Sequence, residues 1–344
     1  MDKVRVGFVG AGFMGQLAHL VNFVELEQCE VVALAETREQ LREQVARKYG
    51  IPKTVPSHLD LCEDPDIDAV VEITSDDMHA PIAIDAMNAG KHVFMEKPMA
   101  TCLKDAQEMV DTAKRNHVHL VIGYMKRYDP GVEKAREMVR GLKESGELGG
   151  ITFARAHCFG GDWVCNVGHP IRTDEPYPDI PPRLPDWLDP KDASRFKGFN
   201  NVYCHNFNLL RFLAGDISDV QFADLNGPTN VVLLTMDGFS AVLELGHLSA
   251  NRWDEQTKLY FEDGWIEVRT PSPLLKNVPA TVELYKAGKI QEVVYPHASW
   301  DWSFRRADEQ FINDILNHEA SRSSGEDSLK DMAVIEEIFR RFYT

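Results

Sequence analysis

The sequence is poor in positive charge, in cysteine and in long apolar runs, and each shortage argues against a class of protein. It has 37 Lys and Arg residues against 54 Asp and Glu, a formal net charge of −17, which argues against nucleic acid or an anionic membrane as the main partner. The six cysteines form no C-x-x-C pair and no zinc-ligand spacing, as expected in a reducing cytosol. There is no run as long as a membrane span and no signal-peptide core at the N-terminus. These features predict a soluble cytoplasmic protein without a metal site.

The first 125 residues alternate short apolar strands with helices. Strands are predicted at 4–9, 30–35, 69–73, 93–95 and 120–123, and helices at 13–25, 40–49, 82–88 and 103–115. Alternation of this kind predicts a parallel sheet with helices on both faces. Residues 1–125 are therefore expected to form an α/β domain with a doubly wound sheet, and 344 residues leave room for a second domain.

Residues 126–344 are predicted to form an α+β domain with a large open sheet, antiparallel or mixed. A helix is expected at 132–144, followed by strands at 151–158, 220–225, 230–236, 241–248, 258–261, 265–268, 282–285 and 292–295, and by helices at 304–317 and 328–342. The sequence leaves open whether the C-terminal helix packs back on the first domain. Between Asp162 and Asn200 lies a segment rich in Pro, Asp and Trp without periodicity; so long an irregular loop is usually functional.

A glycine-rich loop directly follows the first predicted strand and opens the first helix, which is the setting required of a G-x-G-x-x-G dinucleotide-binding motif. Its members are Gly10, Gly12, Phe13, Met14 and Gly15. Glycines there permit a tight turn and close backbone approach to a pyrophosphate, which the helix N-terminus faces. The loop predicts a Rossmann cofactor site.

The cofactor is predicted to be NAD rather than NADP. Glu36 ends the second strand, roughly 20 residues beyond the glycine loop, where a carboxylate accepts hydrogen bonds from the adenosine ribose. A carboxylate at that position disfavours a 2′-phosphate. Arg38 weakens the preference for NAD, because its guanidinium could stack on adenine or bind a phosphate.

Glu96-Lys97-Pro98 follows the short strand that ends at Met95. Ligands of open α/β sheets bind outside the carboxyl ends of the strands, so Lys97 is expected to point into that crevice. Pro98 fixes its own φ, and an X-Pro bond can be cis where a sharp turn is needed. By itself, a lysine after a strand is more often a surface residue.

These motifs together resemble the Gfo/Idh/MocA oxidoreductase family, which includes glucose–fructose oxidoreductase and inositol dehydrogenase. The resemblance extends over nearly the whole chain. It rests on the glycine loop, Thr74–His79, Ala89–Val93 with Glu96-Lys97-Pro98, Gly123–Tyr128, His205 and the turn at Ser324–Asp327.

The resemblance implies the positions of several site residues. Lys97 would lie beside the nicotinamide and the substrate, with Glu96 near the cofactor. The dinucleotide site would also include Thr74, Ser75, Asp76, His79 and Met125. Many relatives carry Pro-Asn where this chain has Ser75-Asp76, and Asp can only accept a hydrogen bond where Asn could also donate one.

The family commonly carries Asp-x-x-x-His on a helix of the second domain, and the matching stretch here has Asn201 and His205. A spacing of four places both on one helical face. Oxidation of a secondary alcohol gives hydride to the nicotinamide and a proton to a base, and histidine suits that base at neutral pH. We hypothesise His205 as the base, Lys97 as electrostatic partner and proton relay, and Asn201 as orienter of the substrate hydroxyl. With Asn in place of Asp, it stays open whether Lys97 takes the proton itself.

The substrate is expected to be a sugar, glycoside or cyclitol, since indole rings stack on sugar C–H faces while polar groups meet hydroxyls. Candidate contacts are Lys97, Arg127, His157, Asp162, Trp163, Asn201 and His205, with Met125, His169, Arg172 and Trp187 as further candidates. For Trp163 and Trp187 a purely structural role in the loop is equally compatible.

Two other functions stay open. One is a redox-neutral lyase or glycosidase that uses tightly bound NAD through a keto-sugar intermediate. The other is a non-catalytic regulatory protein that binds NAD. Relatives also use the open sheet for assembly, so the resemblance implies a homodimer or homotetramer through the C-terminal sheet.

Overall fold

The computed structural model describes residues 3–343, which form two compact units. The first unit contains the residues up to Tyr124 together with Gly168–Lys197 and Phe304–Met332. The second contains Met125–Val167, Gly198–Ser303 and the residues from Ala333 on. The chain therefore leaves the first unit and returns to it twice.

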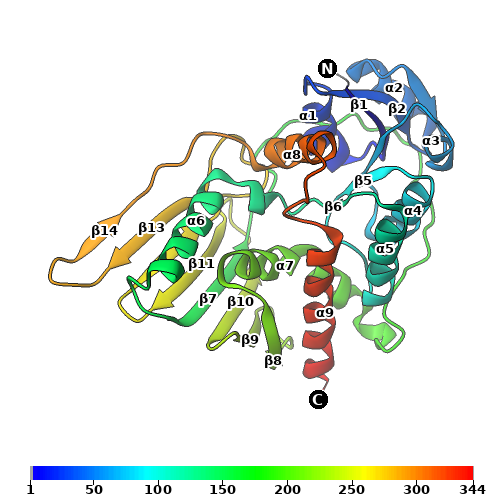
Figure 1. Ribbon diagram of the computed structural model, residues 1–344. Coiled ribbons are helices and arrows are strands. Elements are labelled where there is room, and N and C mark those ends of the chain that lie inside the picture. The colour runs from blue at the N-terminus through cyan, green and yellow to red at the C-terminus, as the bar shows by residue number, and fades with distance from the viewer. Residues whose placement is uncertain (1–2, 344) are drawn as a thin grey trace. The chain divides into compact units, whose positions relative to one another are not determined.

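The first unit is built on a six-stranded parallel sheet in the order β3-β2-β1-β4-β5-β6 (Figure 1). The strands are β1 (Val4–Val9), β2 (Cys29–Ala35), β3 (Lys53–Val55), β4 (Ala69–Glu72), β5 (His92–Met95) and β6 (Leu120–Ile122). Their apolar side chains are almost all buried, as in parallel sheets covered on both faces. This strand order defines the doubly wound dinucleotide-binding fold, with its switch point between β1 and β4. The predicted fold class is confirmed.

The helices of this unit lie between the strands. They are the π-helical turn η1 (Gly15–Leu20), α1 (Val21–Phe23), α2 (Glu39–Tyr49), α3 (Leu59–Cys62), α4 (Asp76–Asn88) and α5 (Leu103–Asn116). Near the C-terminus follow α8 (Ser303–Asn317) and α9 (Gly325–Phe342), of which α9 belongs to this unit only as far as Met332. The first helical stretch begins at Phe13, as expected, and ends at Phe23 rather than at residue 25. One expectation was wrong: α4 begins at Asp76, before the internal Pro81, rather than at residue 82.

The second unit contains an eight-stranded mixed sheet in the order β14-β13-β12-β11-β7-β10-β9-β8. Its strands are β7 (Ile151–Gly160), β8 (Ile217–Asp224), β9 (Asn230–Met236), β10 (Ser240–His247), β11 (Asp254–Phe261), β12 (Gly264–Arg269), β13 (Thr281–Lys286) and β14 (Glu292–Val294). The pair β7–β10 is parallel and the other pairs are antiparallel. Buried residues alternate along most strands, so one face packs on the core.

Among the described residues, two longer helices and one short 3₁₀ turn accompany this sheet. The helix α6 (Pro130–Ser145) lies along the sheet in Figure 1, after the 3₁₀ turn η2 (Met125–Tyr128). A second 3₁₀ turn, η3 (Pro190–Asp192), belongs to the first unit and leads into α7 (Ala193–Ala214), which is in the second unit from Gly198 on. The irregular segment was expected to reach Asn200, which was wrong. Buried Phe196 and Phe199 recur at helical spacing, but Gly198 and neighbouring Asn residues weaken the helical pattern in the sequence.

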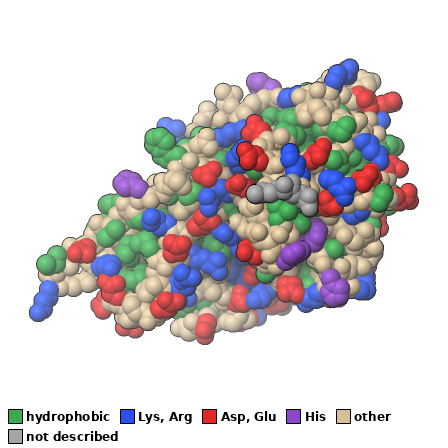
Figure 2. Space-filling view, turned by 45° about the horizontal axis from the view of Figure 1, so that its top comes forward, with side chains coloured by type: hydrophobic (Ala, Val, Ile, Leu, Met, Phe, Trp, Pro, Cys, Tyr) green, Lys and Arg blue, Asp and Glu red, His purple; other side chains and the backbone are tan. Residues whose placement is uncertain are grey.

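Among residues 3–343, no helix combines the length and the apolarity needed to cross a membrane. Acidic and basic side chains intermingle over the face of the molecule in Figure 2. Neither this mixed distribution nor the net charge of −17 favours binding of a polyanion.

Asp129 is a buried cap that joins two parts of the second unit. Its side chain accepts hydrogen bonds from the backbone N–H groups of Gly131 (2.8 Å) and Val132 (3.2 Å) at the start of α6. It also accepts from the N–H of Ala280, just before β13, at 2.9 Å.

We predict that Asp129→Ala lowers the free energy of unfolding by about 2 kcal/mol or more, because it removes a helix cap and leaves buried N–H groups without an acceptor. Urea unfolding followed by circular dichroism measures the change. Asp129→Asn keeps an acceptor oxygen and serves as the control with a smaller loss. Equal stability of the alanine variant and the wild type would contradict the assigned role.

Candidate functional site

Two glycines of the loop after β1 are required by the fold itself. Gly10 has φ 93°, and a Cβ atom on it would lie 2.2 Å from the carbonyl oxygen of Ile73. A Cβ atom on Gly15 would lie 2.4 Å from the carbonyl oxygen of Gly10. Real Cβ atoms do not approach backbone so closely, so neither position accepts a side chain without local rearrangement.

Gly12 differs, because the protein leaves open space beside it. A Cβ atom there would meet no atom within 4 Å, and the fold gives no steric reason for glycine. In a dinucleotide-binding loop, glycine at this place lets the backbone approach the pyrophosphate. The loop, the open space and the helical turn beginning at Gly15 therefore fit a dinucleotide.

Glu36 lies at the carboxyl end of β2 and is held by a dense set of donors. One oxygen, Oε2, accepts from the N–H of Ala11 in the glycine loop at 3.0 Å. Arg38 binds both oxygens, through Nε (2.9 Å) and Nη2 (2.9 Å). Burial raises the pKa of Glu36, but the hydrogen bonds from Arg38 and Ala11 outweigh it and lower the pKa overall. The predicted ribose-binding acid is therefore ionised and tied to the glycine loop.

A buried chain of charges supports Glu96, the residue before Lys97. His19 Nε2 lies 2.8 Å from Glu96 Oε1, and His19 Nδ1 lies 2.8 Å from Asp308 Oδ1. Burial lowers the pKa of His19, but the charge of Asp308 and hydrogen bonds to both carboxylates outweigh it and raise the pKa to about 10. His19 is therefore an imidazolium that donates from both nitrogens at neutral pH. The other oxygen of Glu96 accepts the N–H of Lys97 at 3.0 Å.

A second buried histidine supports the residue after Lys97. His79 Nδ1 lies 2.8 Å from the carbonyl oxygen of Pro98, so this nitrogen must carry the hydrogen. The Nε2 atom of His79 lies 3.7 Å from the fully buried carboxylate of Glu72, whose other oxygen accepts from the N–H and hydroxyl of Thr74. Lys97 thus follows β5 with both neighbours fixed, and the Lys97–Pro98 peptide bond is cis.

The rest of the predicted cofactor set divides between the units. Ser75 is the N-cap residue of α4 and Asp76 its first residue, at the carboxyl end of β4. Met125 is buried in η2 and belongs to the second unit. Roles of these residues in binding a cofactor stay predictions.

Asn201 and His205 are on α7 and belong to the second unit, whereas Lys97 belongs to the first. One helical turn beyond them, Asn208 Oδ1 accepts a hydrogen bond of 2.6 Å from Nε of the buried Arg127. The Arg127 guanidinium also lies over the ring of Phe212, 5.0 Å from its centroid. The helical spacing of Asn201 and His205 is therefore as expected, and their roles stay predictions.

The other predicted substrate residues of the second unit are dispersed. His157 is on β7 and alternates with the buried Ala154, Ala156 and Cys158, so it lies on the opposite face of the sheet; its Nε2 is 3.0 Å from Asp254. Asp162 caps the turn after β7 through the N–H groups of Val164 and Cys165. Trp163 is 43% exposed.

Three further candidates are in the first unit, in the irregular segment that precedes α7. These are His169, Arg172 and Trp187. Trp187 meets Phe196 edge-on, with ring centroids 6.5 Å apart, an arrangement that suits an anchor of the loop.

Sequence reasoning missed four residues that shape these sites. They are Gln16, His19, Asp308 and Glu255; the last is buried and accepts from Nε1 of Trp253 (2.9 Å), from Asn206 (2.9 Å) and from Lys126. Gln16 and His19 are polar residues at otherwise apolar helical positions, which is a sign of buried polar contacts. The sequence does not indicate which residues they contact.

The fold and the open glycine loop are those of a dinucleotide-binding protein. Residues 4–124 match the family model GFO_IDH_MocA, described as an oxidoreductase family with an NAD-binding Rossmann fold. The resemblance to this family that the motifs of the sequence indicate is confirmed.

Known proteins are similar to this chain over different lengths. It is 28% identical to a myo-inositol 2-dehydrogenase of Thermotoga maritima over 64% of this chain and 58% of that protein, so the match spans little more than half of that relative. It is 24% identical to the uncharacterized oxidoreductase YrbE of Bacillus subtilis over 85% of both chains. The structure of a levoglucosan dehydrogenase in complex with NADH and levoglucosan shares the fold, with a TM-score of 0.79, 19% identity and coverage of 99% and 98% of the two chains.

We predict that Gly12→Ala folds like the wild type but binds NADH at least about tenfold more weakly, a loss of about 1.4 kcal/mol. The added methyl group meets no protein atom but intrudes where the pyrophosphate approaches. Fluorescence titration with NADH and thermal unfolding measure the two properties. Gly10→Ala is the contrasting variant, since it should lower the unfolding temperature. Unchanged affinity in Gly12→Ala would contradict this position for the pyrophosphate.

We predict that His19→Asn destabilises the protein by about 3 kcal/mol or more at pH 6.5, because it breaks a buried ion pair on both sides. The folded pKa of about 10 lies above the ordinary value of 6.5, so the stabilisation by His19 is complete below pH 6.5 and is lost as the pH rises through 10.

The difference in unfolding free energy between wild type and variant should shrink over that window, because titratable groups distant from His19 cancel in the comparison. Urea unfolding at several pH values between 6.5 and 10 measures it. A constant difference would mean that His19 is not charged in the folded protein.

Proposed function

We propose that the protein is an NAD-dependent dehydrogenase that transfers hydride between the nicotinamide and a secondary hydroxyl of a sugar, glycoside or cyclitol. The observation that carries the proposal is the carboxyl edge of the first sheet. It has an open glycine loop after β1 and, after β5, a lysine whose neighbours are both fixed by buried histidines. Relatives named as inositol and levoglucosan dehydrogenases support the substrate class.

The reaction requires two groups from the chain, a base and a positive charge. The cofactor, when bound, accepts hydride from the alcohol carbon. The chain supplies a base for the hydroxyl proton and a positive charge for the developing alkoxide. We assign the proton to His205 and the charge to Lys97, with Asn201 orienting the hydroxyl. The rigid setting of Glu96 and Pro98 suits a lysine that must hold a fixed position.

NAD is proposed over NADP because Glu36 is ionised and fixed where the ribose hydroxyls are expected. A 2′-phosphate would meet this carboxylate at close range and be repelled. The proposal also includes a cytoplasmic location, with which six free cysteines agree, and a homodimer or homotetramer through the second sheet.

The test is NAD reduction measured against a panel of inositols, free sugars and glycosides. For the substrate found, Lys97→Met and His205→Ala should each lower kcat/KM by about a hundredfold or more, while NADH affinity changes little. A kcat/KM–pH profile of each variant then separates the base from the electrostatic partner. Turnover close to wild type in both variants would contradict the assignment.

The same panel decides between this function and the redox-neutral one. A dehydrogenase releases NADH in step with substrate oxidation, whereas a lyase or glycosidase consumes the glycoside without net NADH. Binding of NADH with no conversion of any compound would favour the regulatory protein.

A further inference from the structure

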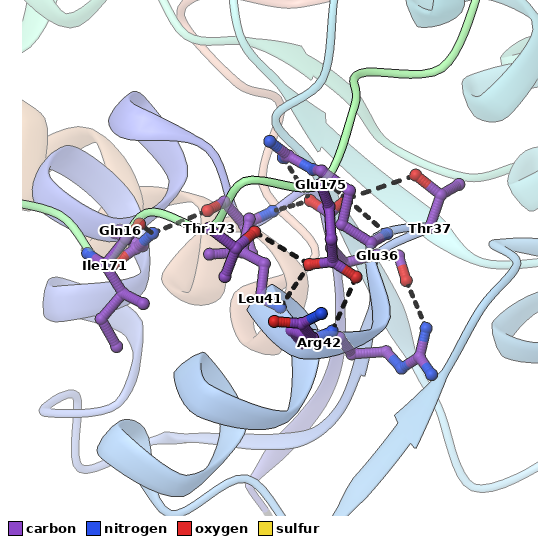
Figure 3. Close-up of polar contacts among 11 residues, drawn as sticks. Gln16, Glu36, Thr37, Leu41, Arg42, Ile171, Thr173 and Glu175 are labelled. Atoms are coloured by element: carbon purple, nitrogen blue, oxygen red, sulfur yellow. Dashed lines mark hydrogen bonds and ion pairs between the residues drawn. The ribbon is translucent and has the colours of Figure 1, made fainter.

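A stretch of the irregular segment, residues 168–183, crosses the first unit and is here called the strap. Its first anchor is Gln16, in the helical turn after the glycine loop. The Gln16 side chain donates to the carbonyl oxygen of Ile171 at 3.0 Å and accepts the N–H of Ile171 at 2.8 Å. Gln16 is only 1% exposed, and it also donates to the carbonyl oxygen of Ala11 inside the glycine loop. Figure 3 shows Gln16 and Ile171 side by side.

The second anchor is Glu175, whose carboxylate lies at the N-terminus of α2. It accepts hydrogen bonds from the N–H groups of Gln40 (2.9 Å) and Leu41 (3.0 Å), and from the hydroxyl of Thr173 (2.8 Å). Figure 3 shows this group beside Glu36. A carboxylate at a helix N-terminus is favoured by both the hydrogen bonds and the helix dipole. Two residues on, the Tyr177 ring lies over the Arg38 guanidinium, 4.3 Å from atom to centroid.

The third anchor lies on the other half of the sheet. Asp77, in the first turn of α4, accepts the N–H of Arg183 at 2.9 Å. The Arg183 guanidinium binds both oxygens of Asp105, in the first turn of α5, at 2.6 and 2.9 Å.

All these anchors follow the carboxyl ends of strands. Gln16 follows β1, Glu175 and Tyr177 meet the residues that follow β2, and Arg183 meets the helices that follow β4 and β5. Dinucleotides bind outside those carboxyl ends, across the switch point. The strap therefore spans the crevice proposed for the cofactor, from the Glu36 side to the Lys97 side.

We propose that the strap closes over the bound dinucleotide, with Glu175 as its latch, so that the cofactor leaves only when the strap detaches. This inference rests on the proposed cofactor site. Glu175 is chosen because it reaches α2 from an otherwise exposed stretch, in which Asp174, Pro176 and Tyr177 are all exposed.

The test measures release of NADH by stopped-flow fluorescence, with excess NAD as the chase. Glu175→Ala should release NADH about tenfold faster than the wild type or more, because it removes both hydrogen bonds to the N-terminus of α2, and one charge-assisted hydrogen bond alone is worth about tenfold. Asp174→Ala is the matched control, since it removes the same charge one residue earlier from an exposed side chain, and it should release NADH at the wild-type rate. Tyr177→Ala, which removes a side chain that is 76% exposed, gives an independent variant should Glu175→Ala fold poorly.

A second readout follows the strap itself. Trypsin cleavage after the exposed Arg172, identified by mass spectrometry, should slow when NADH is bound to the wild type and slow less in Glu175→Ala. The proposal for the strap would be contradicted by equal release rates in wild type, Glu175→Ala and Tyr177→Ala. It would also be contradicted by a rate of cleavage after Arg172 that does not change when NADH is bound. A folded wild type that binds no NADH would instead overturn the proposed function.

Discussion

The constraint on which the first unit depends is a buried imidazolium between two buried carboxylates. His19, Glu96 and Asp308 are each less than 9% exposed. A charge taken out of water is costly unless it is paired. One carboxylate alone would leave one of the two imidazolium N–H groups without an acceptor. Asp308 lies 289 residues from His19, so the chain has to return to the first unit to complete the pair. The helix α8, which carries Asp308, belongs for this reason to the dinucleotide-binding unit as much as the glycine loop does.

The same interaction links parts of the site that the sequence presents as separate motifs. His19 follows the glycine loop in η1, and Glu96 binds the backbone of Lys97. The helical turn after the glycine loop and the backbone that carries Lys97 are therefore joined through the His19 ring. His79 holds Pro98 from the side of α4. A lysine set between two such supports has little freedom, which is what electrostatic stabilisation of a developing alkoxide requires.

Local patterns in the sequence predicted the sheet, the glycine loop and the position of Lys97, because each depends on neighbours a few residues apart. Alternation of strands and helices was enough for the first sheet, apart from the three-residue β3. His19 was not predicted, because a histidine on an apolar helix resembles any buried polar residue until its distant partner is known. The strap was not predicted for the same reason: Gln16 meets Ile171, 155 residues on, and only the fold brings them together. The first turns of α7 were not predicted, because Gly198 and Asn201 have low helix propensity. These turns are helical in the structure, where Phe196 and Phe199 are buried on one face.

The hydrogen bonds that Glu36 already accepts relate the proposed cofactor site to the strap. A carboxylate offers about four lone-pair sites, and Glu36 already accepts from Ala11, from Thr37 and from three N–H groups of Arg38. Ribose hydroxyls can donate to Glu36 only by displacing some of these donors, and two of the donors belong to the Arg38 side chain. That side chain is also the contact of Tyr177 in the strap. If the adenosine binds at Glu36 as proposed, its entry and the contact of the strap with Arg38 are therefore coupled.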